Sequence, residues 1–290
     1  MIFQIMRSVK VVAIIVSFNG GEKTLKTIDA LLPQVSHIHV VDNGSDSFSL
    51  DLLDRMESDK RISLRKFGEN RGIGCALNAG LVKARQLDYS WVLTMDQDSI
   101  AAPDMVGCLI STIARHEDVL CLSPNLIVHG DDKPPLKIGS VPYAITSGNM
   151  VNIEIYNRIG GYNEDYLIDC IDFEFSLRVK KAGFKIIKDP AAILYHELGE
   201  KNDLPKLFKR YYTLHSPLRR YYMFRNLLYL TKTYLFSDFK FIFKLFLLHL
   251  ILFSLLIFYD PKPAASVRMI FRGVRDFFSG KVGAFERGTK

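Results

Sequence analysis

The sequence predicts an α/β fold, a Rossmann-like, mostly parallel sheet flanked by helices, with a helical segment at the C-terminus. Three observations support this prediction. Strand-like and helix-like runs alternate through the first hundred residues, polar clusters follow the strand-like runs, and the chain becomes basic, aromatic and then apolar after residue 200. Regular alternation of this kind is typical of open sheets covered by helices on both faces.

The first strand is the near-continuous β-branched run at 9–19, a pattern typical of a strand buried on both faces. Two glycines end this run, and a helix with apolar residues every three or four positions follows, ended by Pro33. The alternation then continues through a strand at 37–45, a helix at "DLLDRMES", a strand at 62–68, a helix at 73–86 and a strand at 90–96.

The alternation loosens after about residue 103. Here the pattern predicts a helix over "MVGCLISTIARH", a strand over "VLCLSPNLIV", a loop over "GDDKPPLKIG" and a strand-like stretch over "YAITSGNMVN". The stretch "IDFEFSLRVKKAGFKI" is interpreted as a helix that ends at Gly183 and leads into a strand.

Composition and charge limit the class of protein. A chain of 290 residues with 48% hydrophobic and 24% charged residues is sufficient for one large globular domain with an appendage. The net charge of +7 favours anionic partners such as nucleotides, nucleic acid or acidic lipid. The four cysteines have no CxxC spacing, which indicates a reducing compartment and neither a zinc site nor a disulfide framework. The apolar N-terminus is interrupted by Arg7 and Lys10 and is interpreted as a lead-in to the first strand.

Two carboxylates follow the strand at 90–96. The carboxylate oxygens of Asp96 and Asp98 are of the kind that Mg²⁺ and Mn²⁺ prefer as ligands, together with phosphate oxygens. The alternative is a solvated turn, which is the commoner fate of such a pair when nothing else accompanies it.

Other polar residues stand where strands end. In open parallel sheets ligands bind outside the carboxyl ends of the strands, which makes Asn19 and Asp42 candidates to bind a ligand. Asp42 is able to accept a hydrogen bond from a pyrimidine ring, and the alternative is an Asx turn over Gly44. Asn70 and Gly72 belong to "NRGIGCALN", where glycine lets a phosphate approach the start of a helix; the alternative is a plain tight turn.

The ordered motifs together resemble a known family. They are "IIVSFN", "VVDNGSDS", "NRGIGCALNAGLVKA", "LTMDQDS", "TSGNMVN", "GGYNEDYLIDCIDFEFSLRVKKAGFKI" and "YHELG". In this order they resemble family 2 glycosyltransferases of the GT-A fold. Within that family, "MDQDS" together with "IDCIDFEFSLR" and "HSPLRRYYMFRN" resembles the bacterial rhamnosyltransferases that use dTDP-L-rhamnose. The resemblance covers roughly residues 10–230.

The resemblance assigns donor and metal roles. It implies that a divalent cation, Mg²⁺ or Mn²⁺, binds Asp98. His196 would complete the coordination shell of this cation, since imidazole suits Mn²⁺. A strand-end histidine with a structural hydrogen bond is the alternative for His196. The residues implied to hold the nucleotide sugar are Asn19, Asp42, Asn70, Gly72, Asp96, Arg219 and Arg220.

The same resemblance points to Asp172 as the general base, because inverting sugar transfer needs a carboxylate that takes a proton from the acceptor. The family's usual Glu-Asp pair is here Ile171 and Asp172. Glu174 and Asp169 are less favoured candidates for the base, and the alternative for Asp172 is a helix N-cap.

Further residues are expected around the acceptor. The turn Ser147, Gly148 and Asn149 is expected to shape the acceptor edge together with Glu174. The basic residues Arg219, Arg220 and Arg225 are expected to neutralise the departing diphosphate, the alternative being a solvated basic helix face. Trp91, the one tryptophan, is expected in the core because it lies within a strand.

The stretch 241–259 is almost wholly apolar and spans roughly 28 Å as a helix, close to the thickness of a bilayer core. Lys244 and His249 interrupt it and basic residues flank it, so an in-plane helix on an anionic membrane is favoured. A membrane span and a buried or oligomer-interface helix are the alternatives.

The resemblance thus implies an inverting, metal-dependent transfer of L-rhamnose from its dTDP donor to a lipid-linked or oligosaccharide acceptor in bacterial surface polysaccharide synthesis. We expect a catalytic domain at 1–205, with a donor half at about 9–100 and an acceptor half at 101–205, and a membrane-associating helical region at 206–290. The expected location is the cytoplasmic face of the plasma membrane, with homo-oligomers possible and no nucleic-acid partner. A UDP-hexose donor and a non-catalytic scaffold of the same fold are the alternatives.

Overall fold

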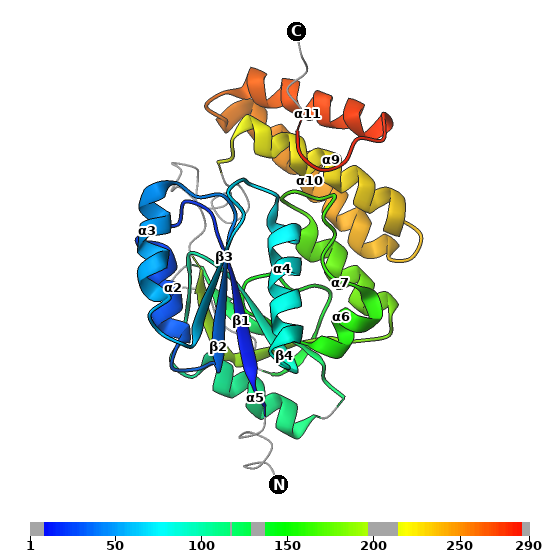
Figure 1. The fold of residues 1–290 in the computed structure, drawn as a ribbon. Coiled ribbons are helices and arrows are strands. Elements are labelled where there is room, and N and C mark those ends of the chain that lie inside the picture. The colour runs from blue at the N-terminus through cyan, green and yellow to red at the C-terminus, as the bar shows by residue number, and fades with distance from the viewer. Residues whose placement is uncertain (1–8, 117, 129–136, 197–213, 286–290) are drawn as a thin grey trace. The chain divides into compact units, whose positions relative to one another are not determined.

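The computed structural model describes residues 9–116, 118–128, 137–196 and 214–285. The chain divides into two compact units (Figure 1). The first, here called the sheet unit, comprises Met1–Asn163 and Phe175–Glu197, and the second, the helical unit, comprises Glu164–Glu174 and Leu198–Lys290. The domain boundary predicted at 205 lies outside the described residues.

The sheet unit confirms the predicted α/β fold. Its strands are β1 (Val11–Ser17), β2 (His37–Asp42), β3 (Ile62–Lys66), β4 (Trp91–Asp96), β5 (Ser99–Ala101), β6 (Cys121–Ile127), β7 (Gly139–Val141), β8 (Asn149–Asn152) and β9 (Ile186–His196). The helices that begin or lie in this unit are α2 (Glu22–Leu31), α3 (Ser47–Met56), α4 (Ile73–Gln86), α5 (Met105–Arg115), α6 (Ile153–Ile159) and α7 (Ile171–Lys181), the last of which runs on from the helical unit.

The sheet is mixed rather than uniformly parallel. Its order is β3-β2-β1-β4-β8-β6-β9-β5, with β7 beside β9. The strands β3, β2, β1 and β4 are parallel, as the regular alternation predicts, and β6 is parallel to β9. The pairs β4–β8, β6–β8, β5–β9 and β7–β9 are antiparallel. The loss of alternation after residue 103 therefore marks the change to antiparallel pairing.

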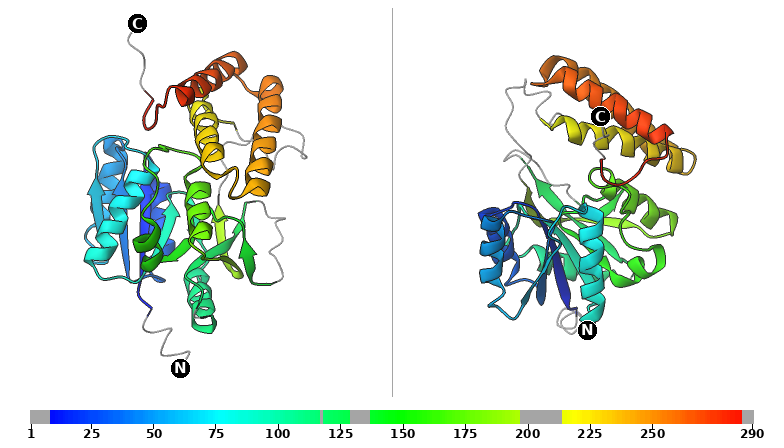
Figure 2. Two further views of the ribbon diagram at one scale, coloured as in Figure 1. Left: turned by 90° about the vertical axis from the view of Figure 1, so that its right-hand side faces the viewer. Right: turned by 45° about the horizontal axis from the view of Figure 1, so that its top comes forward.

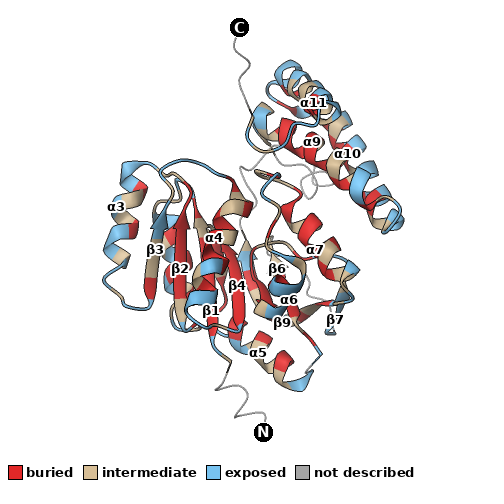
Figure 3. Ribbon diagram, turned by 45° about the vertical axis from the view of Figure 1, so that its right-hand side comes forward, coloured by how far each residue is buried: buried red, intermediate tan, exposed pale blue. Residues whose placement is uncertain are grey.

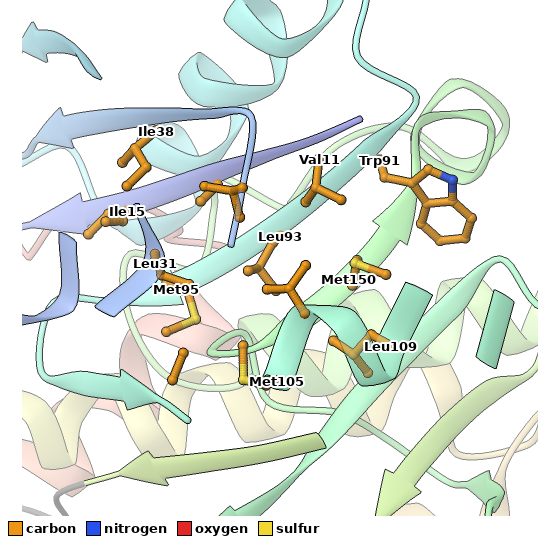
Figure 4. Close-up of a cluster of buried hydrophobic side chains, with 14 of the residues drawn as sticks. Val11, Ile15, Leu31, Ile38, Trp91, Leu93, Met95, Met105, Leu109 and Met150 are labelled. Atoms are coloured by element: carbon orange, nitrogen blue, oxygen red, sulfur yellow. The ribbon is translucent and has the colours of Figure 1, made fainter. Parts of the chain in front are cut away.

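Helices cover both faces of the sheet (Figure 3). α4 packs on one face, where the backbone at Gly80 comes so close to β1 that an added Cβ would lie 2.4 Å from Cγ2 of Ile14. Alternate residues of β1 point to the other face, where a continuous core joins β1 and β4 to α2, α3 and α5. Figure 4 shows Leu93 and Met95 of β4 in this core with Leu109 of α5.

Two sequence predictions can be compared directly with this core. Trp91 is 5% exposed and belongs to the core cluster, so its predicted place is confirmed. The helix predicted at "DLLDRMES" starts earlier, at Ser47, because the Asp46 carboxylate accepts a hydrogen bond from Ser49 N at 2.8 Å and caps the helix.

The helical unit contains α9 (Pro217–Tyr234), α10 (Phe239–Tyr259) and α11 (Pro263–Phe278), which pack against one another (Figure 2). α9 starts at Ser216, whose hydroxyl accepts from Arg219 N, and Pro217 occupies the first helical position. Gly273 of α11 allows close packing, since an added Cβ would lie 2.7 Å from the carbonyl oxygen of Tyr221. The apolar helix predicted at 241–259 is present as α10.

Candidate active site

The carboxyl ends of three parallel strands are level with one another. In β1, Val16 pairs with Asp96 of β4, and Ser17 pairs with Asp42 of β2. Asp42, Asp96 and the residues that follow Ser17 therefore lie along one edge of the sheet, as the position of polar residues in the sequence predicts.

Asp96, Asp98 and His196 meet at this edge. Each is half-buried, and one potential ligand atom from each lies within 4.8 Å of the others. His196 reaches this position because Ser99 of β5 pairs with it across the antiparallel β5–β9 ladder. Two carboxylates and an imidazole form a donor set that fits a divalent cation, with the nitrogen favouring Mn²⁺ over Mg²⁺.

A chain of hydroxyl groups supports this cluster. Nδ1 of His196 lies 2.7 Å from Oγ of Ser99, which leaves Nε2 as the ring nitrogen that is available to a cation when Nδ1 carries the proton. Ser147 donates to Ser99 Oγ at 2.8 Å and accepts from the backbone N–H of Asp96 at 3.1 Å. The two buried serines thus join the backbone of one acid to the ring of the histidine.

Two further residues, Gln97 and Thr27, fix the turn between the acids. The side chain of Gln97 accepts from Phe18 N at 2.7 Å and donates to Phe18 O at 3.1 Å, which fastens the turn to the end of β1. The hydroxyl of Thr27 contacts the carbonyl oxygens of Gln97 and Ser99 at 2.9 and 3.0 Å. The sequence signal for Gln97 was its place between the two acids, whereas Thr27 lies on α2 and gave none.

Asp42 forms the Asx turn that was one of its two interpretations. Its fully buried carboxylate accepts from the N–H groups of Gly44 and Ser45, both at 3.0 Å, and from the Ser45 hydroxyl. Asn19 is exposed with φ of 52°, and its side chain accepts from Asp46 N at 2.8 Å. Both residues therefore shape the loops after β1 and β2.

The loop before α4 is cross-linked to the loop after β2. Oδ1 of Asn70 accepts from Gly72 N at 3.0 Å and from Nδ2 of Asn43 at 3.2 Å. Gly72 has φ of 91° at the start of α4, a conformation that favours glycine. Gly44 also needs to be glycine, because an added Cβ would lie 2.5 Å from the backbone of Glu69. Asn43, which follows Asp42 at the end of its strand, is the side chain that joins these loops.

The predicted acceptor residues Ser147, Gly148 and Asn149 are buried. The hydroxyl of Ser147 is hydrogen-bonded to Ser99 and to the backbone of Asp96. Oδ1 of Asn149 accepts from the thiol of Cys121 at 3.5 Å. An added Cβ at Gly148 would lie 2.5 Å from Cγ of Pro124. This geometry does not favour direct contact of these residues with an acceptor, since their polar atoms already bond inside the fold.

In the helical unit, Asp172 is the second residue of α7. It is half-buried and its carboxylate accepts from Phe173 N at 2.9 Å. It therefore lies within the first turn, after the N-cap position, where the helix dipole stabilises a negative charge. Burial raises the pKa of the neighbouring Cys170 thiol well above its ordinary value, with the charges of Asp169 and Asp172 acting in the same direction, so the thiol stays neutral.

The other two candidate bases have partners in the helical unit. Glu174 is 5% exposed and accepts from the hydroxyl of Tyr234 at 2.9 Å. Asp169 receives hydrogen bonds from the guanidinium of Arg219, with N–O distances of 3.1 to 3.3 Å. Of the three carboxylates, Glu174 is thus the least accessible to an acceptor.

Arg220 departs from its predicted donor role. It is 1% exposed, and its Nε lies 3.9 Å from the buried carboxylate of Asp260. The carboxylate of Asp260 compensates the charge of this guanidinium inside the helical unit, so the side chain of Arg220 is not directed to a ligand outside it. Arg219 keeps 42% of its side chain exposed and is the better placed of the two to meet a ligand.

Comparison with known proteins adds independent evidence. The family model described as "Glycosyl transferase family 2" matches residues 12–178. The chain is 28% identical over 234 residues to the dTDP-rhamnosyl transferase RfbF of Shigella flexneri, which covers 74% of this chain and 77% of that protein. An uncharacterized glycosyltransferase of Haemophilus influenzae is 34% identical over 74 residues, or 26% of this chain and 27% of that protein.

Two solved structures share the fold. S. aureus TarS 1-349 has a TM-score of 0.55 at 14% identity, over 93% of this chain and 72% of that one. GalNAc-T7, crystallised with UDP, GalNAc and Mn²⁺, has a TM-score of 0.58 at 15% identity, over 66% of this chain. The matched region spans 44% of that chain, less than half of its length. Because the family model matches more than half of the length of this chain and the solved structures share its fold, this chain belongs to glycosyltransferase family 2 and has the GT-A fold.

Proposed function

We propose that this chain is an inverting, metal-dependent rhamnosyltransferase that transfers L-rhamnose from dTDP-L-rhamnose to a saccharide acceptor of a bacterial surface polysaccharide. The observation that supports metal-dependent transfer most directly is the convergence of Asp96, Asp98 and His196 at the carboxyl edge of the sheet. The choice of donor rests on the similarity to RfbF.

The proposal gives the cluster residues separate roles. Asp98 and His196 would hold Mg²⁺ or Mn²⁺, and Asp96 would face the nucleotide. A bound divalent cation supplies positive charge to the diphosphate of the donor. The loops that contain Asn19, Asp42, Asn70 and Gly72 would enclose the nucleoside, and Arg219 would face the diphosphate; we leave Arg220 out because it is buried against Asp260.

The chemical step uses Asp172 as the general base. Its carboxylate takes the proton of an acceptor hydroxyl as the oxygen forms a bond to C1 of the sugar. The bond from C1 to the phosphate oxygen breaks, and its electron pair leaves with dTDP. Attack from the face opposite the leaving group inverts the configuration at C1.

The test is a donor screen with purified protein, a lipid-linked acceptor extract and mass spectrometry of the product. We expect transfer of a deoxyhexose from dTDP-L-rhamnose, and its loss with EDTA. Asp172→Asn is expected to reduce kcat by roughly 10²- to 10⁴-fold, and near-normal turnover of this variant would refute the assignment of the base. Preferred transfer from a UDP-hexose would overturn the donor assignment, and absence of both transfer and donor hydrolysis would favour the non-catalytic scaffold.

We also propose that the helical unit attaches the enzyme to the cytoplasmic face of the plasma membrane. By length and composition α10 is long and apolar enough to cross a membrane. In its most apolar stretch of 18 residues, 28% is buried. The exposed large apolar residues of the unit include Phe236, Phe239, Phe243, Leu247, Leu250, Ile251, Ile257, Phe258, Phe271 and Phe278. The exposed basic residues among 214–285 are Lys232, Lys240, Lys244, Lys262, Arg268, Arg275 and Lys281, and no carboxylate residue in that range is in the exposed class.

Packing favours an in-plane position over a span. The opposite side of α10 contacts α9 and α11 through buried residues that include Leu252 and Leu256. If α10 crossed the bilayer in this packing, the charged side chains of α9 and α11 would have to enter hydrocarbon with it, which is costly. An in-plane helix keeps those charges at the level of the lipid headgroups.

A further inference from the structure

The segment before Asp172 has an unusual backbone. Asp169 and Cys170 both have φ of 64°, in the left-handed region. Among the described residues other than glycine, positive φ occurs elsewhere only at Asn19 and Asp88, so this is the one consecutive pair. A non-glycine residue in this region is disfavoured by about 1–3 kcal/mol, and it persists where surrounding contacts hold it. α7 starts at the next residue, Ile171.

Asn226 of α9 holds this backbone. Its Nδ2 donates to the carbonyl oxygen of Ile168 at 2.8 Å and to that of Asp169 at 3.2 Å. Its Oδ1 accepts from Nε of Arg225 at 3.1 Å, which fixes the direction of the amide. Asn226 is fully buried, and the carbonyl groups that it contacts are part-buried, so the loss of its two donated hydrogen bonds would remove a fixed partner from the backbone of Ile168 and Asp169.

Other α9 contacts fix the two ends of the same segment. Arg219 binds the Asp169 carboxylate, and Tyr234 donates to Glu174 at 2.9 Å. Arg219, Asn226 and Tyr234 are seven and eight residues apart, which places them on neighbouring positions along one side of α9. α9 therefore contacts the segment 168–174 on both sides of Asp172, and the ring of Phe173 also packs edge-on against Phe241 of α10.

We propose that Asn226 is a positioning residue for the general base: it holds the left-handed turn at 169–170 and so sets the direction in which α7 presents Asp172. This inference rests on the proposed function, because it assumes that Asp172 takes the proton. Asn226 does not itself contact the reacting atoms in this scheme. Its effect should therefore appear in turnover and in the pH dependence of turnover rather than in donor binding.

The central variant is Asn226→Asp, which keeps the size and the acceptor for Arg225 but removes the two donated hydrogen bonds. Tyr229→Phe is the matched control, because the Tyr229 hydroxyl of the same helix is directed to the carbonyls of Lys281 and Phe277 at 3.0 and 3.5 Å, away from the 168–174 segment. We expect Asn226→Asp to lower kcat roughly 10- to 100-fold, as small misplacements of reacting groups do. KM for the donor is expected to change less than about threefold, and the apparent pKa on the acid limb of the kcat profile should move. Tyr229→Phe should leave kcat and this limb unchanged.

A rescue experiment tests the role of the backbone. Glycine adopts positive φ without strain, so Cys170→Gly should restore part of the turnover in the Asn226→Asp background. We expect at least a threefold gain in kcat there and none in the wild-type background. An equal effect of Cys170→Gly in both backgrounds would contradict the role of Asn226 in holding the turn.

Hydrogen exchange separates this inference from the proposed function. Amides of residues 168–172 should exchange faster in Asn226→Asp than in wild type or Tyr229→Phe, whether or not the correct donor is known. Unchanged exchange in this segment, or a loss of kcat that only follows a loss of folded protein, would overturn the inference while leaving the proposed function intact. A wild-type protein that transfers no sugar would instead contradict the proposed function, and the exchange measurement would still decide the role of Asn226.

Discussion

At the scale of single residues, the cluster at the sheet edge depends on side chains that are not themselves proposed to contact the metal ion or the nucleotide. Asp98 and His196 are the proposed metal ligands and Asp96 is proposed to face the nucleotide, whereas Ser99 contacts the ring of His196 and Ser147 contacts the backbone of Asp96. The second ring nitrogen of a metal-binding imidazole almost always donates an N–H hydrogen bond, and removal of such outer partners typically weakens metal binding by about 10- to 100-fold.

We therefore expect Ser99→Ala to weaken Mn²⁺ binding about tenfold, because the imidazole of His196 loses the group that fixes its tautomer. Calorimetric titration with Mn²⁺ in the presence of dTDP measures this, since the metal and the nucleotide are each expected to bind weakly alone. Ser111→Ala is the control: its hydroxyl donates to a carbonyl on the exposed surface of α5. Equal Mn²⁺ affinities of the two variants would show that Ser99 does not support the cluster.

A second residue-scale prediction concerns His39, which is 4% exposed and shares the Ser63 hydroxyl with His37. Burial, helped by Lys83, lowers the pKa of His39 from 6.5 to about 4. In the unfolded chain His39 therefore binds a proton below about pH 6.5, whereas in the folded chain it binds one only below about pH 4. Stability is greatest above pH 6.5 and falls as the pH decreases through this window.

For His39 alone this amounts to about 2 kcal/mol between pH 7.5 and pH 5. Urea unfolding of wild type and His39→Gln at both pH values measures it, because the variant lacks the titrating group. The difference in unfolding free energy between the two proteins should shrink or reverse at pH 5. A difference that is the same at both pH values would refute this pH linkage.

At the scale of elements, the contact of α4 with β1 depends on Gly80. An alanine there would improve helix propensity by about 1 kcal/mol, but its Cβ would lie 2.4 Å from the buried, branched side chain of Ile14. Overpacking of this kind typically costs about 1–3 kcal/mol, so the steric effect should exceed the gain.

We expect Gly80→Ala to lower the free energy of unfolding by up to about 2 kcal/mol, which is the overpacking cost less the gain in helix propensity. Gly107→Ala in α5 is the matched control, because no atom outside its own helix and immediate neighbours lies within 4 Å of its added Cβ. That variant should be neutral or more stable by up to about 1 kcal/mol. Urea denaturation measures both changes, and a gain of stability in Gly80→Ala would show that α4 moves away from β1 without penalty.

At the scale of the whole molecule, the composition of the helical unit sets it apart from the sheet unit. Its described surface combines large exposed apolar side chains with exposed lysine and arginine. Anionic lipid attracts juxtamembrane basic residues by about 1 kcal/mol each near the surface, and salt screens this attraction.

Flotation of the full chain with vesicles tests this surface. We expect binding to vesicles that contain phosphatidylglycerol, weaker binding to pure phosphatidylcholine, and partial release at 1 M salt. Lys240→Glu with Lys244→Glu should weaken binding at least about tenfold, since each reversal removes an attraction and adds a repulsion. Asp51→Asn on α3 of the sheet unit serves as the control. Equal binding of all variants to both kinds of vesicle would argue against an anionic membrane partner, and self-association through this surface would point to an oligomer interface.

Much of the sheet and part of the candidate site could be predicted from local pattern. The strands β1 to β4 were predictable because strands buried on both faces are continuous apolar runs, and Asp42 and Asp96 were placed by the ends of those runs. β5 was not predicted, because a strand of three residues has no measurable period. The burial of Ser147 and Arg220 was not predictable, since neither residue has a local signal for its partner.

Local patterns predicted the α/β class, the polar residues at the strand ends, the family and the apolar C-terminal helix, because each depends on periodicity or on motifs within short stretches of sequence. The meeting of His196 with Asp98 depends on the tertiary structure, since a strand pairing joins residues far apart in the chain. The enclosure of Arg220 and the hydrogen bonds from Asn226 to the backbone before Asp172 depend on it too. Such contacts follow from packing, because a buried polar group forms its hydrogen bonds with the elements that pack against it, and these elements are often distant in the sequence.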